Sequence, residues 1–185
     1  MVTAAEIILG TADERHKNFV SFYHQDDETY RTAFEAAFGH LFINKSVKTG
    51  DIDEDNSTDY IKRLIAEDYI TDASVVTVLV GPDTKKRKHV DWEIAAGLNK
   101  KVGGYSGLIG ILLPTFPWAS DRKFHYDDLP PRLAANVKAG YASLYDWNTL
   151  NAANIETLID QAFLNRKDKA DLIDNSLQLF SNNRP

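Results

Sequence analysis

One glutamate follows a cluster of basic residues in the middle of this chain, in an arrangement that suits chemistry on a charged small molecule. The segment reads VVTVLVGPDTKKRKHVDWEIAAGLN over residues 75–99. A β-branched run ends at Gly81, four consecutive cations occupy 85–88, and Glu93 stands just inside a helical pattern. A carboxylate with no obvious structural partner beside a cationic rim is a candidate catalytic group, and the cations are candidates for attracting an anion such as a pyrophosphate.

Both features also have an ordinary explanation. Glutamate is a good helix former that usually lies on a solvated face. His89 stands four residues before Glu93 on the same predicted face, so the two could form a simple helix pair. The four cations could lie in a solvated loop before the helix begins, and Trp92 is more often a core residue than a ligand platform. Periodicity alone leaves these alternatives open.

Strand-like and helix-like patterns alternate along the chain. Apolar runs bounded by turn residues predict strands at 18–22, 41–43, 75–80, 108–113 and 144–147. Apolar residues at helical spacing predict helices over 30–41, 57–65, 90–98 and 155–163, with a short helix ending near Gly140. The runs at 75–80 and 108–113 are unbroken, so we expect them to be central parallel strands buried on both faces.

This alternation predicts an α/β fold with a parallel sheet, helices on both faces and right-handed crossovers. Five strands favour the flavodoxin-like order 2-1-3-4-5, whose switch point lies between the first and third strands. Ligands would then bind near 22–26, after the first strand, and from Gly81 onward. Since Glu93 follows the second of these loops, the fold argument and the candidate carboxylate meet at one place.

Composition fits one globular domain. The chain has 185 residues, 21 basic and 27 acidic, and a net charge of -6, which argues against a general nucleic-acid binder. It has no cysteine, no apolar run that would span a membrane and no signal-peptide pattern, so we expect a cytoplasmic protein. We divide it into an N-terminal extension at 1–17, the α/β domain at 18–168 and a C-terminal helical tail at 169–185. The extreme ends, 1–17 and 181–185, are expected to be mobile.

Several specific motifs are absent from the sequence. It has no G-x-G-x-x-G after a strand and no P-loop, and the near match at Gly104 lacks the final glycine of a nucleophile elbow. The histidines lack metal-binding spacing. Asp51, Asp53 and Asp55 begin like a calcium loop, but Asn56 and Lys62 stand where Gly and Glu are needed. We therefore expect no metal site.

Two segments are similar to a known family. NFVSFYHQDD at 18–27 resembles the first box of TIR domains, and KHVDWEIAAGL at 88–98 resembles the helix that carries the TIR glutamate. With LFINKSV and YIKRLI between them, the combination resembles the compact TIR-like family of bacteria and archaea that includes the TIR protein of Thoeris anti-phage defence. The resemblance covers about residues 18–165.

The resemblance implies NAD chemistry. TIR enzymes cleave the nicotinamide–ribose bond, and Thoeris TIR proteins turn the ADP-ribose part into a small signal that activates a partner effector. NAD would be a substrate rather than a cofactor, Glu93 would be catalytic, and the transition state would resemble an oxocarbenium ion. The implied substrate-binding residues are Phe22, Tyr23, His24, Asn44, Ser46 and Trp92. The resemblance also allows a homo-oligomer on activation.

The sequence departs from the family pattern in ways that leave other functions open. Trp92 directly precedes Glu93, whereas many TIR enzymes space their tryptophan further ahead. The acidic loop at 44–56 lacks the Pro-Gly pair of signalling adaptors, and we expect this loop to be mobile and to border the pocket. The alternatives are a non-catalytic TIR-like interaction module, with Glu93 as a surface residue, and a nucleotide-binding sensor.

Overall fold

Five parallel strands form one sheet in the order β2-β1-β3-β4-β5. The computed structural model describes residues 15–46 and 70–185. In chain order the strands and helices are β1 (Lys17–Ser21), α2 (His24–Phe38), β2 (Ile43–Asn44), β3 (Val75–Val80), α4 (Lys88–Gly97), β4 (Gly107–Leu112), α5 (Pro131–Ala139), β5 (Ser143–Asp146) and α6 (Ala152–Asp168). The flavodoxin-like order predicted from the sequence is confirmed.

The two unbroken apolar runs form the centre of the sheet. β3 pairs in parallel with β1 on one side and β4 on the other, and β4 also pairs with β5. All six residues of β3 and all six of β4 are buried. The predicted central position of both strands is therefore confirmed, and it follows from their lack of polar alternation.

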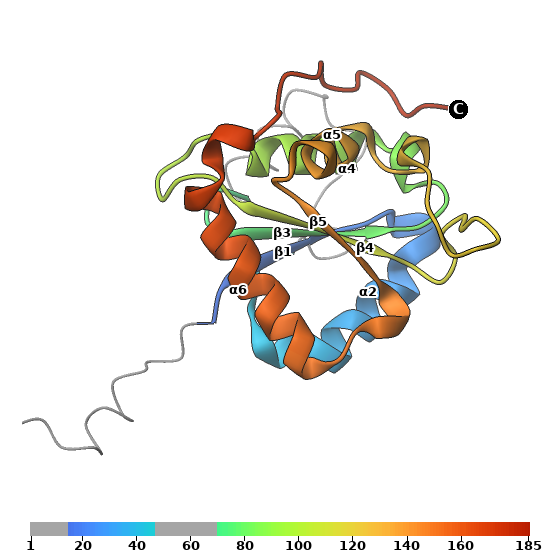
Figure 1. Ribbon diagram of the computed structural model, residues 1–185, viewed down its shortest axis with the longest axis horizontal. Coiled ribbons are helices and arrows are strands. Elements are labelled where there is room, and N and C mark those ends of the chain that lie inside the picture. The colour runs from blue at the N-terminus through green and yellow to red at the C-terminus, as the bar shows by residue number, and fades with distance from the viewer. Residues whose placement is uncertain (1–14, 47–69) are drawn as a thin grey trace, which may run out of the picture.

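Helices cover both faces of the sheet (Figure 1). α4 and α5 lie on one face, and α2 and α6 lie on the other. Each face has its own core. Val76, Val78 and Leu133 belong to the core under α4 and α5, whereas Leu79 and Ile159 belong to the core under α2 and α6. Alternate residues of each central strand thus point to opposite layers.

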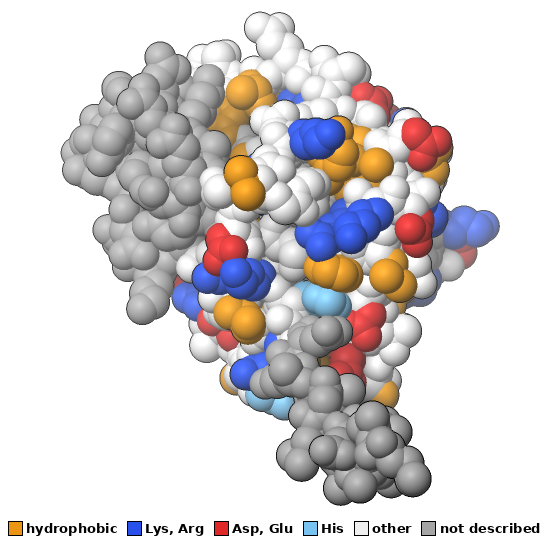
Figure 2. Space-filling model, turned by 90° about the vertical axis from the view of Figure 1, so that its left-hand side faces the viewer, with side chains coloured by type: hydrophobic (Ala, Val, Ile, Leu, Met, Phe, Trp, Pro, Cys, Tyr) orange, Lys and Arg blue, Asp and Glu red, His pale blue; other side chains and the backbone are white. Residues whose placement is uncertain are grey.

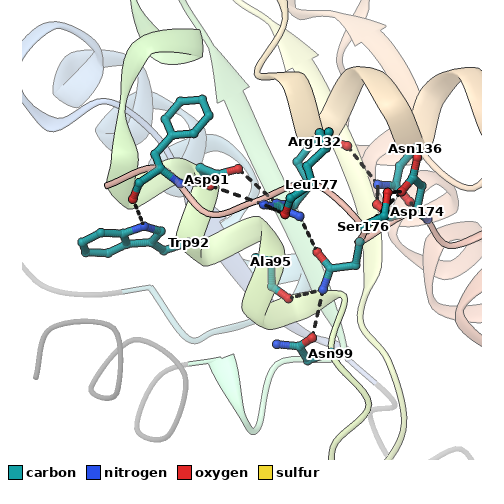
Figure 3. A network of polar contacts seen from close by, with 11 residues as sticks. Asp91, Trp92, Ala95, Asn99, Arg132, Asn136, Asp174, Ser176 and Leu177 are labelled. Carbon is teal, nitrogen blue, oxygen red and sulfur yellow. Dashed lines mark hydrogen bonds and ion pairs between the residues drawn. The ribbon is translucent and has the colours of Figure 1, made fainter. Parts of the chain in front are cut away.

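α4 is unusual because it is buried nearly all round. Seven of its residues are buried, including the charged Asp91 and Glu93. A helix on the surface of a domain normally keeps one solvated side. Here the sheet covers one side of α4 and the C-terminal segment covers the other (Figure 3). α4 is therefore enclosed by two layers, of which the sequence pattern revealed only one.

Some expected elements differ in the structure. The second strand is Ile43–Asn44 rather than 41–43, and the fifth is Ser143–Asp146. The tail expected to be helical over 169–185 has only one short 3-10 turn, Ala170–Leu172, so this expectation is wrong. Its residues are held by side-chain and backbone hydrogen bonds to other elements, which need no helical periodicity. The helix expected at 57–65 lies outside the described residues.

A glycine lets α6 lie directly on the sheet. A Cβ placed on Gly107, the first residue of β4, would collide with the backbone carbonyl of Ala162 in α6. Because backbone atoms cannot swing aside as a flexible side chain can, Gly107→Ala must move the helix.

We therefore expect Gly107→Ala to lower the stability by about 1–3 kcal/mol, the usual cost of overpacking. For a protein of this size, this corresponds to a fall of roughly 2–12 °C in melting temperature. Gly39→Ala is the matched control, because the nearest atom to its added Cβ is 3.9 Å away and its φ of -59° is helical. Equal melting temperatures for the two variants would contradict this packing argument.

Candidate functional site

A cleft of about 480 Å³ lies between the loop after β1 and the beginning of α4. Its lining residues are Phe22, Tyr23, His24, Gln25, Arg87, Lys88, His89, Val90 and Asn183. β1 leads to α2 on one face of the sheet, and β3 leads to α4 on the other face. Adjacent strands whose connections leave in opposite directions create a crevice at their carboxyl ends. The cleft is therefore at the predicted switch point.

Aromatic and cationic groups line this cleft together. The guanidinium of Arg87 lies over the ring of Tyr23, 3.9 Å from its centroid, and the rings of Phe22 and His24 are 4.2 Å apart. Tyr23 also donates a hydrogen bond of 2.7 Å to Gln25. Flat rings can stack on a base and cations can neutralise phosphates. The structure brings Phe22, Tyr23 and His24 together, as the family resemblance implied.

The basic cluster at 85–88 divides into two pairs with different surroundings. Lys85 pairs with Asp128 at 2.7 Å, and Lys86 pairs with Asp83 at 2.8 Å. Arg87 and Lys88 instead line the cleft. The first pair is thus engaged in ion pairs, whereas the second pair borders the candidate site; attraction of an anion stays a prediction.

Glu93 lies one turn of α4 below the cleft residues His89 and Val90. Its side chain is only 4% exposed, so it is not the surface residue that helix periodicity favoured. The hydroxyl of Ser21, the last residue of β1, donates a hydrogen bond of 2.5 Å to the carboxylate oxygen Oε2. Burial raises the pKa of Glu93 from 4.5 to about 8, although the Ser21 hydrogen bond opposes this rise. The carboxyl group is thus mostly protonated near pH 7 in this conformation.

Ser21 is a site residue that sequence reasoning did not single out. It is buried, and it directly precedes the cleft residues Phe22 and Tyr23 in the chain. The sequence contained one signal, because Ser21 and Phe22 form a Ser-Phe pair at the end of the strand in the first TIR-like box. Its contact with Glu93 joins residues 72 positions apart, and local patterns do not report such a distance.

A second buried carboxyl group, that of Asp27, connects α2 to the turn between β3 and α4. Asp27, in the first turn of α2, accepts a hydrogen bond of 3.2 Å from the hydroxyl of Thr84, which itself accepts one of 2.8 Å from the Gly81 amide. Burial raises the pKa of Asp27 to about 6. A side chain at Gly81 would collide with the Asp27 carboxyl group. Asp27 therefore positions the turn between β3 and α4 against α2.

Three other predicted substrate-binding residues lie elsewhere. The indole of Trp92 is buried and donates a hydrogen bond of 2.8 Å to the carbonyl of Phe180. It borders a separate hollow under the C-terminal segment and does not line the cleft, so its place beside a ribose stays a prediction. Its direction follows from helix geometry, since consecutive residues of α4 point about 100° apart.

Asn44 and Ser46 lie at and beyond the end of the short strand β2. Ser46 accepts a hydrogen bond of 2.9 Å from the Val20 amide, and Asn44 donates one of 2.7 Å to Glu35. Neither lines the cleft among the described residues. Most of the loop expected to gate the pocket, residues 47–56, lies outside the described part of the chain.

A different hollow, of about 390 Å³, lies between α6 and the start of β1. It is at the end where the strands begin, the face shown in Figure 2, where basic side chains lie beside hydrophobic ones. His16 stacks on Phe163 there with ring centroids 3.8 Å apart, and Arg166 covers the same ring. None of the residues predicted to bind substrate lines this hollow.

The described residues contain no cluster of side chains suited to binding a metal ion. Over 15–46 and 70–185, no group of three or more His, Asp or Glu side chains is arranged to hold a metal ion. In the same ranges, no helix is both long enough and apolar enough to cross a membrane. The candidate site contains carboxyl groups, aromatic rings and cations, together with the polar side chains of Ser21, Gln25 and Asn183.

A family comparison covers the segment that contains this site. The family model described as the TIR-like domain of Thoeris protein ThsB matches residues 19–116, more than half of the chain. The chain belongs to the Thoeris ThsB TIR-like family. The match begins within β1 and ends at Phe116, so this TIR-like segment contains Ser21, Glu93 and every cleft residue except Asn183. No curated protein matches the chain.

Membership of the ThsB TIR-like family confirms the resemblance seen in the two sequence boxes. It also accounts for the five-stranded parallel sheet in the order β2-β1-β3-β4-β5. The family places the protein in the context of a defence system.

Proposed function

We propose that this protein cleaves NAD between nicotinamide and ribose and makes an ADP-ribose-derived nucleotide signal for anti-phage defence. The single observation that carries the proposal is the buried Glu93 carboxyl group, held by Ser21 beneath a cleft lined by aromatic rings and cations. The volume of this cleft, about 480 Å³, is within the range of small-molecule sites. A downstream effector would respond to the diffusible product.

The proposed reaction needs no proton donor for its leaving group. The bond from the ribose C1′ to the nicotinamide nitrogen breaks, and nicotinamide leaves with the electron pair as a neutral ring. The ribosyl carbon becomes oxocarbenium-like, and the Glu93 carboxylate stabilises this positive charge. With water as the acceptor, the products are nicotinamide, ADP-ribose and one proton. A hydroxyl or nitrogen nucleophile in place of water would give a cyclic or conjugated product.

In this scheme, loss of a proton from Glu93 links NAD binding to catalysis. The pKa of about 8 describes the free protein, in which burial is the main influence. The nicotinamide ring of NAD carries a positive charge, and an opposite charge nearby lowers the pKa of a carboxyl group. NAD binding would therefore favour loss of the proton from Glu93 and produce the carboxylate that the reaction requires.

The interaction-module alternative assigned Glu93 to the protein surface. The burial of its side chain and its contact with Ser21 favour a role inside the domain instead. The direct test is to incubate the purified full chain with NAD and to follow nicotinamide release by chromatography, with and without lysate from phage-infected cells as trigger. Release by the unaltered protein supports the enzyme, and no release under any trigger favours the interaction module.

The pH dependence of the reaction should identify the carboxylate. We expect kcat/KM to rise roughly tenfold per pH unit below about pH 8 and to level off above it, because this ratio reports ionisation in the free enzyme. The expected midpoint of this rise is the raised pKa of Glu93, about 8. Nicotinamide release should be measured between pH 7 and 9.5, after subtraction of the release from NAD alone.

Ser21→Ala provides the control for this assignment. The Ser21 hydroxyl lowers the pKa of Glu93. Its removal should therefore move the rise of kcat/KM to higher pH. A profile that is flat between pH 7 and 8, or one that Ser21→Ala leaves in place, would contradict the role of Glu93 as the titrating group.

A further inference from the structure

The C-terminal residues 174–184, called here the C-terminal strap, run along the whole of α4. Asn175 contacts the end of the helix, donating hydrogen bonds to the Ala95 carbonyl at 3.1 Å and to Asn99 at 2.9 Å. Phe180 lies at its middle, where its amide donates to Asp91 at 2.9 Å and its carbonyl accepts from Trp92 at 2.8 Å. The strap therefore runs in the direction opposite to the helix.

The strap ends at the cleft. The side-chain oxygen of Asn183 accepts a hydrogen bond of 2.9 Å from the backbone amide of Lys88, the first residue of α4. The next residue, Arg184, donates its amide to the Lys86 carbonyl at 2.8 Å. Asn183 also lines the cleft together with Tyr23 and Arg87. A segment that lies 95 residues from Lys88 in the sequence thus completes the candidate site.

A buried clamp fixes the upstream part of the strap (Figure 3). Arg132, on α5, bonds to Asp91 with its Nε at 3.0 Å and to the strap through Asn175 at 2.8 Å and the Leu177 carbonyl at 2.9 Å. Asn136 joins the same network through the Asp174 carbonyl and amide. Arg132 and Asp91 are both almost fully buried. These contacts dock the upstream part of the strap against α4 and α5.

We propose that the C-terminal strap is a working part of the nucleotide cleft: it holds α4, and Asn183 donates a hydrogen bond to an oxygen atom of the bound nucleotide. The Lys88 amide determines which end of the Asn183 side chain faces it, because a backbone N–H requires the amide oxygen. The Asn183 nitrogen is then left as the donor. This ligand contact rests on the proposed NAD activity, whereas the hold on α4 does not.

Binding of ADP-ribose by the full chain tests the ligand contact. We expect Asn183→Ala to weaken ADP-ribose binding about fivefold, the effect of one neutral hydrogen bond, as measured by titration calorimetry. Asn182→Ala is the matched control, since this exposed neighbour does not line the cleft, and it should bind as the unaltered protein does. Equal binding by all three proteins would overturn the role of Asn183.

Hydrogen exchange tests the hold on α4 without any ligand. Asn175→Ala should speed exchange about fivefold or more at residues 95–99, because it removes both bonds to the end of α4. Peptides from β4 serve as the internal reference. Ser176→Ala is the control variant, since the Ser176 hydrogen bonds go to Asp174 within the strap. Unchanged exchange in Asn175→Ala would overturn the structural role.

The two measurements separate the two proposals. If the unaltered protein binds no ADP-ribose, the proposed nucleotide activity fails, and the ligand contact of Asn183 fails with it. The exchange experiment then still decides whether the strap holds α4. If ADP-ribose binds but Asn183→Ala binds it equally well, the proposed function stands and the ligand contact is overturned.

Discussion

Glu93→Gln is expected to lower the rate of nicotinamide release about 10²–10³-fold, the usual effect of losing one electrostatic stabiliser. Gln keeps the shape of the side chain and can still accept the hydrogen bond from Ser21. It cannot carry the negative charge that offsets an oxocarbenium-like transition state. The measurement is nicotinamide release at saturating NAD near pH 8.5, where the carboxylate form of the unaltered enzyme predominates.

The same substitution should stabilise the fold. Burial raises the pKa of Glu93 from its ordinary value of 4.5 to about 8 in the folded protein. A raised pKa gives stability that is present below about pH 4.5 and lost as the pH rises through 8, since the unfolded chain ionises more readily. Gln has no proton to lose. At pH 8 the free energy of unfolding of Glu93→Gln should therefore exceed that of the unaltered protein by an amount on the order of a few kcal/mol, and its melting temperature should be higher. At pH 4.5 the two proteins should differ little.

Higher stability with lower activity is a combination that a folding defect cannot produce. The control is Glu156→Gln, an exposed position on α6 away from the cleft, which should leave both rate and melting temperature unchanged. An active unaltered protein and an equally active Glu93→Gln variant would overturn the catalytic role. A variant that is inactive and unfolded would instead show that the Glu93 carboxyl group is needed for the structure.

The sheet could be predicted from the sequence because its signals are local. The run from Val75 to Val80 is β-branched and ends at a turn, so it indicates a buried strand without knowledge of its neighbours. Strand–helix alternation then fixes the parallel arrangement and brings the loop after β1 close to the start of α4. The grouping of Phe22, Tyr23 and His24 in one cleft follows from the topology alone.

The environment of Glu93 could not be predicted in the same way. Val90 and Ile94 mark the stripe of α4 that faces the sheet, and Glu93 lies at the edge of this stripe, although glutamate usually lies on a solvated face. The other sides of the helix would be expected to face solvent. The strap covers another side through amide and backbone hydrogen bonds, which leave no hydrophobic period in the sequence. The burial of Glu93, the direction of Trp92 and the anchoring of Asn183 all depend on contacts between segments that are distant in the chain.

The second large effect is expected at the buried clamp. Arg132→Met should destabilise the protein by about 3–5 kcal/mol, because it leaves the Asp91 carboxylate buried without its cationic partner. The Arg132 side chain is 1% exposed and that of Asp91 is 3% exposed. Bulk water therefore cannot solvate the Asp91 carboxylate once the guanidinium is gone. The same change removes two contacts to the strap, at Asn175 and Leu177. Chemical denaturation of the purified variant would measure the loss.

A compensating substitution distinguishes an unpaired charge from simple loss of packing. Asp91→Leu in the Arg132→Met background removes the isolated carboxylate, and replacing a buried ion pair by apolar groups is often neutral. The double variant should therefore recover much of the stability that the single variant loses. Lys138→Met, an exposed cation on the same helix, should change the stability by less than about 0.5 kcal/mol. If Arg132→Met were as stable as Lys138→Met, the clamp could not be what fixes the strap, and the position of α4 would have to be set by its packing on the sheet alone.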